Sequence, residues 1–488
     1  MGDLRILIDT NVFIPLEGGD ETPTEALAAE LIRLAQRHGC PVFVHPASVN
    51  DLKRDANVRR LQRNLQKLQK YPLLTLPPQP DDEFVTAVQS HEVTPQDTVD
   101  NALLYAVHRD CVACLVTEDR GIHRKAARFT FADRVYRLEE VIEALRQRFE
   151  PTRRLPPSIH NVPVHSVAAD ESILSDLRRI YEDFDAWLSR IKRKGREAWI
   201  CREGQKNLVA ICIYKEEDTP YRELRGRGLK LCTFTVHKAA RGRKLGELLL
   251  KAAFEYARAK RLQWAYVEFF EERNSSLTLL LKDFGFGKLT VRSRRGEAVY
   301  AKHFVPDEAG AGLSPLDYHI RFGPPALKSR GVSGYLVPIR PHYHESLFPD
   351  AQAQQGLFPG ESPCGNAIRK AYICNAVTRK PRPGDLLFFY RTHDTKAVTT
   401  LGVLETALES RDPEVVWALV AKRTVFDVAE IVRLCQRRAY VLLFRQVGHL
   451  RDKCSFVELK RLRALSGPAQ SITELRRSCV ADLLGRLP

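Results

Sequence analysis

Five aspartates in the first 120 residues could support catalysis if folding brought them together. Asp9 directly follows the apolar run ILI, Asp51 lies in VHPASVNDL, Asp97 and Asp100 lie in TPQDTVDNALLYA, and Asp119 lies in LVTEDRG. Each has an ordinary alternative role as a turn residue or helix cap. Carboxylates held close together repel one another, and a divalent cation relieves that repulsion. Oxygen ligands favour Mg²⁺ or Mn²⁺, which can activate a water molecule for attack on a phosphodiester.

The elements that must position these acids follow from an alternation of short apolar runs and helical stretches through residues 1–150. RILIDT, PVFVHP, LLTLP and CLVTED read as strands, so the pattern predicts a parallel α/β sandwich. Side chains at the carboxyl ends of parallel strands meet at one edge of the sheet. We therefore expect Asp9, Asp51 and Asp119 to converge there, with Asp97 and Asp100 at the start of a nearby helix.

ILIDTN, VNDL, DTVDNALLYA and LVTEDRG resemble the successive motifs of PIN-domain ribonucleases over roughly residues 3–148. The resemblance implies that four aspartates are catalytic: Asp9, Asp51, Asp100 and Asp119. It implies metal binding by Asp9, Asp100 and Asp119, with Asp97 as an alternative ligand. The family usually has Glu where Asp51 stands, so the shorter side chain is a departure from its pattern.

A basic segment, LKRDANVRRLQRNLQKLQK, follows Asp51 directly. Its arginines, Arg59, Arg60 and Arg63 among them, are typical of a solvated helix face. Beside a cluster of acids they would also give RNA phosphates a positive path toward the site. We expect RNA binding here.

A second kind of chemistry is indicated by TFTVHKAARGRKLGELLLKAAF, in which a strand, a basic glycine-containing turn and a helix follow one another. Backbone amides at such a helix start can bind a pyrophosphate. Together with VEFFEERNSSLTLLLKDFGF, this segment resembles the acetyl-CoA-binding core of the GNAT acyltransferases over residues 164–305. The resemblance implies these cofactor-binding residues: Val236, Arg241, Gly242, Arg243, Lys244, Gly246 and Asn274.

Two departures from the GNAT pattern favour ligand binding over catalysis. Lys244 stands where the loop expects Gly, and its side chain would crowd the approach of a phosphate. Leu281 stands where the family often has the Tyr that protonates the leaving thiolate, and Leu cannot donate a proton. Reuse of the fold as a scaffold or as a basic RNA surface is the alternative.

Short strands between turn residues predict a small barrel at residues 334–450. GNAIRKAY, PGDLLFFYR, TTLGVLE and AKRTVFDVAEI resemble the ASCH/EVE group of PUA-like barrels, which implies RNA or modified-nucleotide recognition. Basic residues that meet phosphate and aromatic residues that stack on bases are interleaved in this region. The expected RNA-binding residues are Arg369, Lys370, Tyr372, Tyr390 and Arg391.

The composition of the 488 residues agrees with a multidomain α/β and α+β protein. We predict a nuclease domain at 1–150, a linker at 151–163, a GNAT-like domain at 164–305, a linker at 306–333, a barrel at 334–450 and a helical tail at 451–488. Eleven cysteines, an odd number, argue for reduced thiols, and no apolar run approaches the length of a membrane span, so we expect a cytoplasmic protein.

The formal net charge of +16 predicts a polyanionic partner such as RNA, and it is divided unevenly, −4 in residues 1–150 and +20 in the remainder. Our first hypothesis is a Mg- or Mn-dependent endoribonuclease whose other domains bind acetyl-CoA and RNA. By analogy with PIN proteins, this includes a toxin-like or defence-associated role and an antitoxin or regulatory protein as partner. The alternatives are an acetyltransferase acting on RNA or protein with an inactive PIN scaffold, and a non-enzymatic RNA-binding regulator.

Overall fold

The protein is described by a computed structural model that divides into two compact units. Its described residues are 4–13, 23–53, 58–88, 94–150, 158–203, 207–349, 367–378 and 380–487. Unit 1 comprises Met1–Arg153, Ala371–Asn375 and Leu408–Val441. Unit 2 comprises Arg154–Lys370, Ala376–Ala407 and Leu442–Pro488. Each unit therefore contains segments that are far apart in the sequence.

The sheet of unit 1 has four strands in the order β2-β1-β3-β4, and every adjacent pair is parallel. The strands are β1 (Ile6–Ile8), β2 (Val42–Val44), β3 (Cys114–Val116) and β4 (Val135–Tyr136). The predicted strand LLTLP contributes only a single bridge, between Leu73 and Val44. The sequence analysis did not predict β4. The parallel arrangement agrees with the predicted sandwich, whereas membership of the PIN fold remains a prediction.

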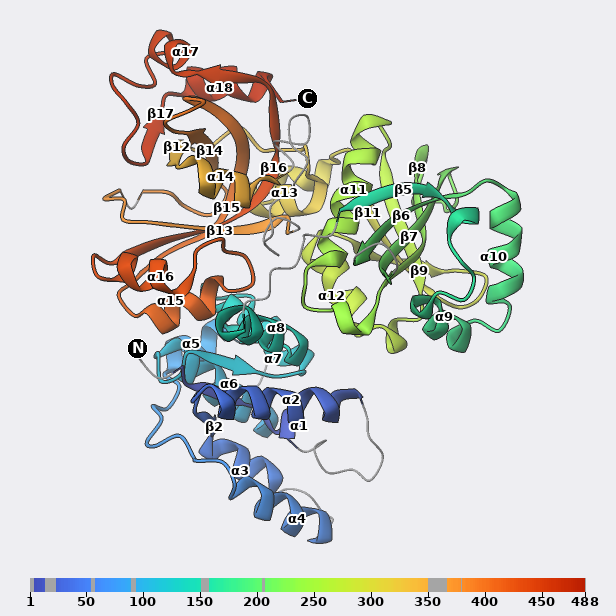
Figure 1. The fold of residues 1–488 in the computed structure, drawn as a ribbon, viewed down its shortest axis with the longest axis vertical. Coiled ribbons are helices and arrows are strands. Elements are labelled where there is room, and N and C mark those ends of the chain that lie inside the picture. The colour runs from blue at the N-terminus through green and yellow to red at the C-terminus, as the bar shows by residue number, and fades with distance from the viewer. Residues whose placement is uncertain are drawn as a thin grey trace. The chain divides into compact units, whose positions relative to one another are not determined.

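Helices surround this sheet (Figure 1). They are α1 (Thr10–Phe13), α2 (Pro23–Arg37), α3 (Pro46–Leu52), α4 (Val58–Leu68), α5 (Asp82–Val88), α6 (Pro95–His108), α7 (Arg120–Ala126), α8 (Leu138–Phe149), α15 (Pro413–Val420) and α16 (Val428–Cys435). Helix α6 starts with a capping box in which Thr94 and Asp97 bond to each other's backbone amides. This cap fixes the first turn of α6, one turn before Asp100.

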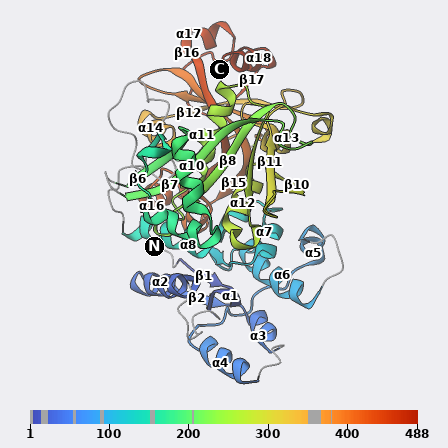
Figure 2. The same ribbon diagram turned by 90° about the vertical axis from the view of Figure 1, so that its right-hand side faces the viewer.

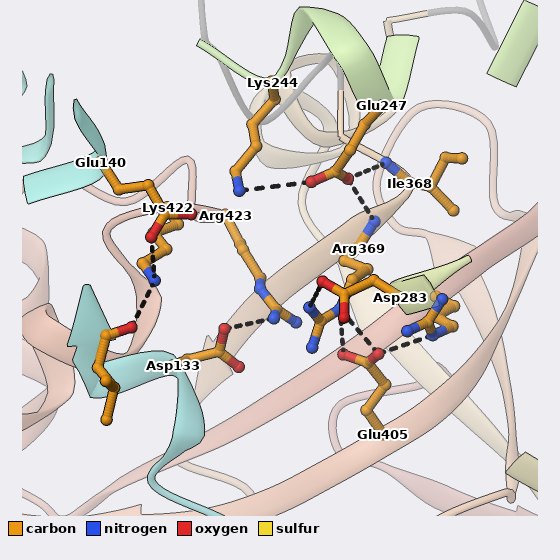
Figure 3. Close-up of polar contacts among 12 residues, drawn as sticks. Asp133, Glu140, Lys244, Glu247, Asp283, Ile368, Arg369, Glu405, Lys422 and Arg423 are labelled. Carbon is orange, nitrogen blue, oxygen red and sulfur yellow. Dashed lines mark hydrogen bonds and ion pairs between the residues drawn. The ribbon is translucent and has the colours of Figure 1, made fainter. Parts of the chain in front are cut away.

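Buried ion pairs join α15 and the turn after it to the first 150 residues, and Figure 3 shows the pair in the turn, between Arg423 and Asp133. Arg423 is 3% exposed and forms an ion pair with Asp133, and Arg148 contacts Glu414 at 2.7 Å. A charge out of water needs a partner of opposite charge, so these contacts hold the distant segments together. Residues 408–441, which we predicted to belong to the C-terminal barrel, thus pack within unit 1.

Unit 2 begins with a seven-stranded sheet of order β10-β11-β9-β8-β7-β6-β5. Its strands are β5 (Ile159–Pro163), β6 (Glu197–Glu203), β7 (Asn207–Asp218), β8 (Arg227–Val236), β9 (Trp264–Phe269), β10 (Gly287–Arg292) and β11 (Ala298–His303). Neighbouring strands are antiparallel except β8 and β9, which are parallel.

Alternating side chains of this sheet bury both of its faces. On β6, Ala198 and Ile200 pack with α9 (Ser175–Ile180) and α10 (Phe184–Arg193), while Trp199 and Cys201 pack with the opposite core. That opposite core contains α11 (Leu245–Ala259) and α12 (Ser275–Asp283). Figure 1 shows α10 and α11 on opposite sides of the sheet, and α10 lies in front of it in Figure 2. This mixed sheet with helices on both faces confirms the GNAT-like fold.

The remaining sheet has six strands in the order β13-β16-β15-β14-β12-β17. They are β12 (Gly334–Ile339), β13 (Arg369–Cys374), β14 (Leu386–Arg391), β15 (Ala397–Ser410), β16 (Ala439–Ser455) and β17 (Thr473–Leu475). The associated helices are α13 (Pro315–Phe322), α14 (Pro341–Leu347), α17 (Phe456–Arg461) and α18 (Arg477–Gly485). The multidomain α/β organisation with mixed sheets is confirmed, whereas closure into a PUA-like barrel remains a prediction.

Parts of the predicted linkers and tail have regular structure. Residues 159–163 form β5 and belong to the seven-stranded sheet, although IHNVP lacks the alternation of a half-buried strand. The predicted linker at 306–333 contains α13, whose Phe322 is fully buried. The predicted helical tail contains the end of β16 and all of β17, in addition to α17 and α18. The described part of the chain contains no helix both long and apolar enough to cross a membrane.

The buried pair in unit 1 generates a stability prediction. Arg423→Met should lower the free energy of unfolding of unit 1 by about 3–5 kcal/mol, because the buried Asp133 would lose the positive charge of Arg423. The double variant Arg423→Met/Asp133→Asn should recover part of this loss. Arg37→Met, which breaks the exposed pair with Glu150, is the control and should cost about 1 kcal/mol or less. Scanning calorimetry measures all three. An Arg423→Met effect no larger than the control would contradict the assignment of residues 408–441 to unit 1.

Candidate active site

A cavity of about 860 Å³ opens where β8 and β9 separate. The two strands pair only from Gly228 with Trp264 to Leu231 with Val267, although β8 continues to Val236 and β9 to Phe269. Beyond the paired region, the facing backbone groups of the two strands are available to a ligand. Side chains from α9, α10, β7 and the β10–β11 hairpin complete the lining.

A β-bulge lies beside the point of separation. Ile213 of β7 pairs with Thr233, but Tyr214 pairs with Leu231, so Cys232 is an extra residue in β8. A bulge leaves its extra residue out of the ladder and re-aims the local backbone. Cys232 lines the cavity. Burial raises the pKa of its thiol, which argues against a thiolate nucleophile.

Three tyrosine–glutamate pairs line the interior of the cavity. They are Tyr221 with Glu268, Tyr266 with Glu217, and Tyr181 with Glu297, and in each pair the phenol donates to the carboxylate. Burial and then the hydrogen bond to the carboxylate raise the pKa of Tyr181 and Tyr221, so these phenols stay protonated. The interior therefore combines acceptor carboxylates with fixed donors.

Glu297 differs from the other two carboxylates in its charge balance. Lys230 forms an ion pair with Glu268 at 2.6 Å, and Lys215 pairs with Glu217. Glu297 is 6% exposed and accepts hydrogen bonds from Tyr181 at 2.7 Å and Ser293 at 2.8 Å, but forms no ion pair with any described residue. A buried carboxylate without a cationic partner favours a cationic ligand.

The predicted phosphate loop lies between β8 and α11. Val236 ends β8, and Gly242 and Lys244 both adopt left-handed backbone conformations, with φ of 79° and 59°. Lys244 thus stands at a position whose backbone favours glycine, which explains the family's preference there. Its ammonium lies 3.4 Å from Glu247, in the first turn of α11. The amides at this helix start can attract an anion.

The other predicted cofactor residues have structural roles as well. Arg243 is 5% exposed and lies 3.1 Å from Glu203, while Arg241 is half-buried in the loop. A side chain on Gly246 would collide with Leu280 of α12, so glycine permits the close packing of α11 on α12. Asn274 caps α12 through the amide of Leu277 and lines the cavity.

Sequence reasoning missed every carboxylate of the cavity. Glu217 comes from β7, Glu268 from β9 and Glu297 from the hairpin just before β11, and no motif unites them. A usable signal was present in IYKEED and AYVEFF, in which acids follow apolar runs that are buried on both faces. Leu281, where the family often has Tyr, is fully buried in the core and cannot take part in proton transfer.

In unit 1 three of the predicted acids converge. Asp9 follows β1, and its carboxylate accepts hydrogen bonds from the Thr117 hydroxyl at 2.7 Å and the Thr10 amide at 2.6 Å. Burial raises the pKa of Asp9 to about 6, and the charge of Asp100 adds to this shift against the hydrogen bonds. Asp119 accepts bonds from the amides at the start of α7 and adds in turn to the raised pKa of Asp100, for which burial is the main cause.

A lysine already neutralises part of this cluster. The ammonium of Lys125 lies 2.8 Å from Asp97 and 2.7 Å from Asp100, and it holds the pKa of Asp97 well below its usual range. The described residues contain no group of three His, Cys, Asp or Glu side chains that could hold a metal ion. As arranged, the acids do not fit the predicted Mg²⁺ or Mn²⁺. The side chain of Asp51, a predicted catalytic residue, lies outside the described residues.

The predicted RNA-binding residues of the C-terminal sheet do not form an exposed surface. Lys370, Tyr372 and Tyr390 are 0%, 7% and 3% exposed. Arg369 is bound to Glu405 at 2.9 Å, and Arg391 pairs with Asp394 and Glu345. These side chains are buried or ion-paired within the protein, and RNA binding by them remains a prediction.

The predicted basic helix face in unit 1 is described only in part. Arg59 is exposed on α4. The side chains of Arg60 and Arg63 lie outside the described residues. RNA binding by this helix remains a prediction.

Residues 164–286 match the model of the acetyltransferase (GNAT) family. This stretch is therefore a GNAT acetyltransferase domain, and it contains the cavity walls formed by β7, β8 and β9. The match spans about a quarter of the chain, and no curated protein matches the chain significantly.

Solved structures with local likeness fall into two groups. ASCH from Zymomonas mobilis is 16% identical with a TM-score of 0.25, and the alignment covers 31% of this chain and 94% of that one. A GNAT-family acetyltransferase from Staphylococcus aureus is 16% identical with a TM-score of 0.24, covering 30% and 99%. A mutant AtaT toxin bound to the C-terminus of the antitoxin AtaR and acetyl-CoA is 13% identical with a TM-score of 0.24, covering 30% and 92%. Scores this low carry no argument about function.

The raised pKa of Asp9 predicts a pH-dependent stability. The folded state holds a proton on Asp9 up to about pH 6, whereas the unfolded chain loses it near pH 4. Stability should therefore fall between these two values as pH rises, by up to about 3 kcal/mol, and should not recover above pH 6. Asp9→Asn should lack this contribution, while the exposed Asp82→Asn should retain it. Denaturant unfolding of both variants and the parent from pH 4 to 8 measures the difference. Parallel curves for Asp9→Asn and the parent would contradict it.

Proposed function

We propose that the protein transfers the acetyl group of acetyl-CoA to a primary amine bound in the cavity between β8 and β9. The observation that carries this proposal is a set of carboxylates facing that cavity within a GNAT acetyltransferase domain. An amine must lose a proton when it is acylated, and a nearby carboxylate can accept it. These proton-accepting carboxylates are therefore stronger evidence for catalysis than Lys244 in the loop is against it.

The reaction forms a bond between the amine nitrogen and the acetyl carbon and breaks the thioester bond, so CoA leaves as the thiol. Glu268 is our candidate for the base because it is half-buried, lines the cavity and follows the paired part of β9. The Tyr221 hydroxyl and the Lys230 ammonium orient its carboxylate. The backbone at the Cys232 bulge is the candidate donor to the acetyl oxygen.

The residues present fit an acetyl-CoA molecule in its two parts. The unpaired edges of β8 and β9 offer backbone donors and acceptors to the amides of its pantetheine arm. The loop residues Arg241 and Lys244 offer positive charge to its pyrophosphate, and the start of α11 offers backbone amides. Leu281 leaves protonation of the leaving thiolate to water or to a tyrosine of the cavity.

Glu268→Gln tests the proposed base. It should lower kcat roughly 10²- to 10⁴-fold with little change in the KM for acetyl-CoA, because the amide keeps the shape but cannot accept the proton. Glu272→Gln, an exposed change that does not face the cavity, is the matched control. Labelled acetyl-CoA and a panel of amines provide the assay. Equal kcat for Glu268→Gln and the parent would exclude Glu268, and absence of transfer to every amine would exclude the proposal.

A second candidate is RNA cleavage by residues 1–150, favoured by the convergence of Asp9, Asp100 and Asp119 at one edge of the parallel sheet. Lys125 supplies the cation at this cluster, so metal-dependent cleavage would require its displacement. A toxin-like role and an antitoxin partner depend on this candidate or on acetyl transfer, and remain predictions.

This second candidate predicts that total RNA is cleaved in Mg²⁺ or Mn²⁺ by the parent and not by Asp9→Asn. The amide removes a negative charge while leaving the hydrogen bonds with Thr117 and Thr10 largely possible. Cleavage is followed by gel electrophoresis with chelator as control. The variant Lys125→Met tests whether the cluster can bind a metal ion when the Lys125 ammonium is absent. If Lys125 substitutes for a metal ion, added Mg²⁺ should raise the thermal stability of Lys125→Met and leave that of the parent unchanged. Equal RNA cleavage by the parent and Asp9→Asn would rule out this candidate.

A further inference from the structure

The cavity of unit 2 separates its charges by depth. Its acids Glu217, Glu268 and Glu297 are half-buried or buried, as described above. Six exposed cations of the described chain line it, Arg273 and Arg295 among them. The other four, called the mouth cations below, come from α10 and the β10–β11 hairpin: Arg190, Lys194, Arg292 and Arg294. A ligand that satisfied both layers would carry a cation at its inner end and an anion at its outer end.

The four mouth cations have no ion-pair partner among the described residues. Arg295, beside them, differs because it pairs with Asp183. Some surface cations on this domain are paired, as Arg227 is with Glu216. Others, such as Arg193 and Arg222, form no ion pair with a described residue, so the distinguishing feature of the mouth cations is that four of them line one cavity. An unpaired cluster of four positive charges around a cavity mouth attracts anions and focuses them on the opening.

The mouth cations are distinct from the predicted acetyl-CoA loop. That loop spans residues 236–246, and none of these residues contributes to the described cavity lining. Arg190 and Lys194 belong to the end of α10, while Arg292 and Arg294 flank the turn of the hairpin. The positive charge at the mouth therefore serves the acceptor and not the pyrophosphate of acetyl-CoA.

Amine and anion sites are close together in this hairpin. Ser293 donates to Glu297, and Ser293 lies between Arg292 and Arg294 in the sequence. The inner carboxylate and two outer guanidinium groups are thus held within one tight turn. A molecule bridging them needs only a few bonds between its amine and its anionic group.

We infer that the acceptor is a phosphorylated primary amine, whose ammonium group contacts Glu297 and whose phosphate contacts the mouth cations Arg190, Lys194, Arg292 and Arg294. Phosphate suits these groups because arginine forms paired hydrogen bonds with its oxygens. Phe184, Trp187 and Phe270 add aromatic surface between the two layers. This inference rests on the proposed acetyl transfer for its consequence but concerns binding, which is measured separately.

Trp187 provides a binding signal that does not depend on activity, because it is half-buried and lines the cavity. Fluorescence titrations of the full chain should compare O-phosphoethanolamine with ethanolamine. We expect the phosphorylated amine to bind roughly tenfold tighter or better at low salt, and the preference to shrink as salt screens the mouth. Trp187→Phe should abolish the signal. Equal affinity for the two amines would overturn the inference.

Variants test which cations create the preference. The double variant Arg292→Ser/Arg294→Ser should lose most of the preference for phosphate while retaining its affinity for ethanolamine. Arg193→Ser/Arg222→Ser removes the same charge from exposed positions that do not line the cavity, and should retain the preference. Glu297→Gln should weaken binding of both amines. Equal losses in the two double variants would mean general electrostatics and would overturn the site.

The source of the phosphate is distinguished by a second ligand. A short RNA oligonucleotide with a terminal primary amine should be compared with O-phosphoethanolamine in both titration and acetyl transfer. Stronger use of the oligonucleotide would place the acceptor on RNA, and stronger use of the small amine would make it a metabolite-sized molecule; either supports the inference. Preferential binding without acetyl transfer would overturn the proposed function and leave the ligand class supported.

Discussion

The buried carboxylate of Glu247 is the interaction on which the architecture of unit 2 depends (Figure 3). It is 5% exposed, so its charge must be compensated inside the protein. Its donors are the amides of Ile368 and Arg369, at 3.1 and 3.4 Å, and the ammonium of Lys244, at 3.4 Å. One side chain in the first turn of α11 thus ties the proposed phosphate loop to the first residues of β13. Separation of the two segments would remove both amide donors and leave Lys244 alone to balance the buried carboxylate, which is costly. The loop geometry therefore depends on α11 and on the residues at the start of β13 together.

The sequence predicted the GNAT-like segment well because its signals are local. The strand, turn and helix around Gly242 are consecutive in the chain, from Arg227 to Ala259, and the left-handed conformation of Lys244 explains why the family prefers glycine at this position. The cavity carboxylates were not predictable in the same way, since Glu217 and Glu268 come from two strands and Glu297 from a hairpin, and long stretches of chain separate the three. Only the strand order brings them together. Strand β5 escaped prediction because an edge strand with polar and proline residues resembles a linker.

The N-terminal acids show the reverse case. Their proximity in the fold was predictable from the sequence, but the cation that neutralises them was not. Strand ends in a parallel sheet must meet at one edge, so the proximity of Asp9 to the groups after β3 follows from topology alone. The position of Lys125 does not follow from any motif, because its contact with Asp97 and Asp100 depends on how α7 packs against α6. A lysine between carboxylates satisfies the same electrostatic demand as a metal ion. A cluster of acids in the sequence is thus compatible with a bound metal ion or with a lysine between the carboxylates, and only the packing distinguishes the two.

Charge in this protein is informative only after burial is known. From the excess of +20 outside the first 150 residues, we predicted that this part of the chain binds RNA. Yet Lys302, Lys370 and Arg445 are only 1%, 0% and 5% exposed, and Arg423 is buried in unit 1. Part of the positive charge therefore makes contacts inside the protein. Lys302 donates to backbone carbonyls, and Arg445 binds Glu405. Interleaved basic and aromatic residues therefore look alike in a strand that binds RNA and in one that packs between two layers. The cations at the cavity mouth differ from these, because they form no ion pair with any described residue, although Arg292 donates a hydrogen bond to the carbonyl of Gly296. The positive charge that remains available to an anionic partner is therefore that of the cavity mouth, where we propose that the acceptor binds.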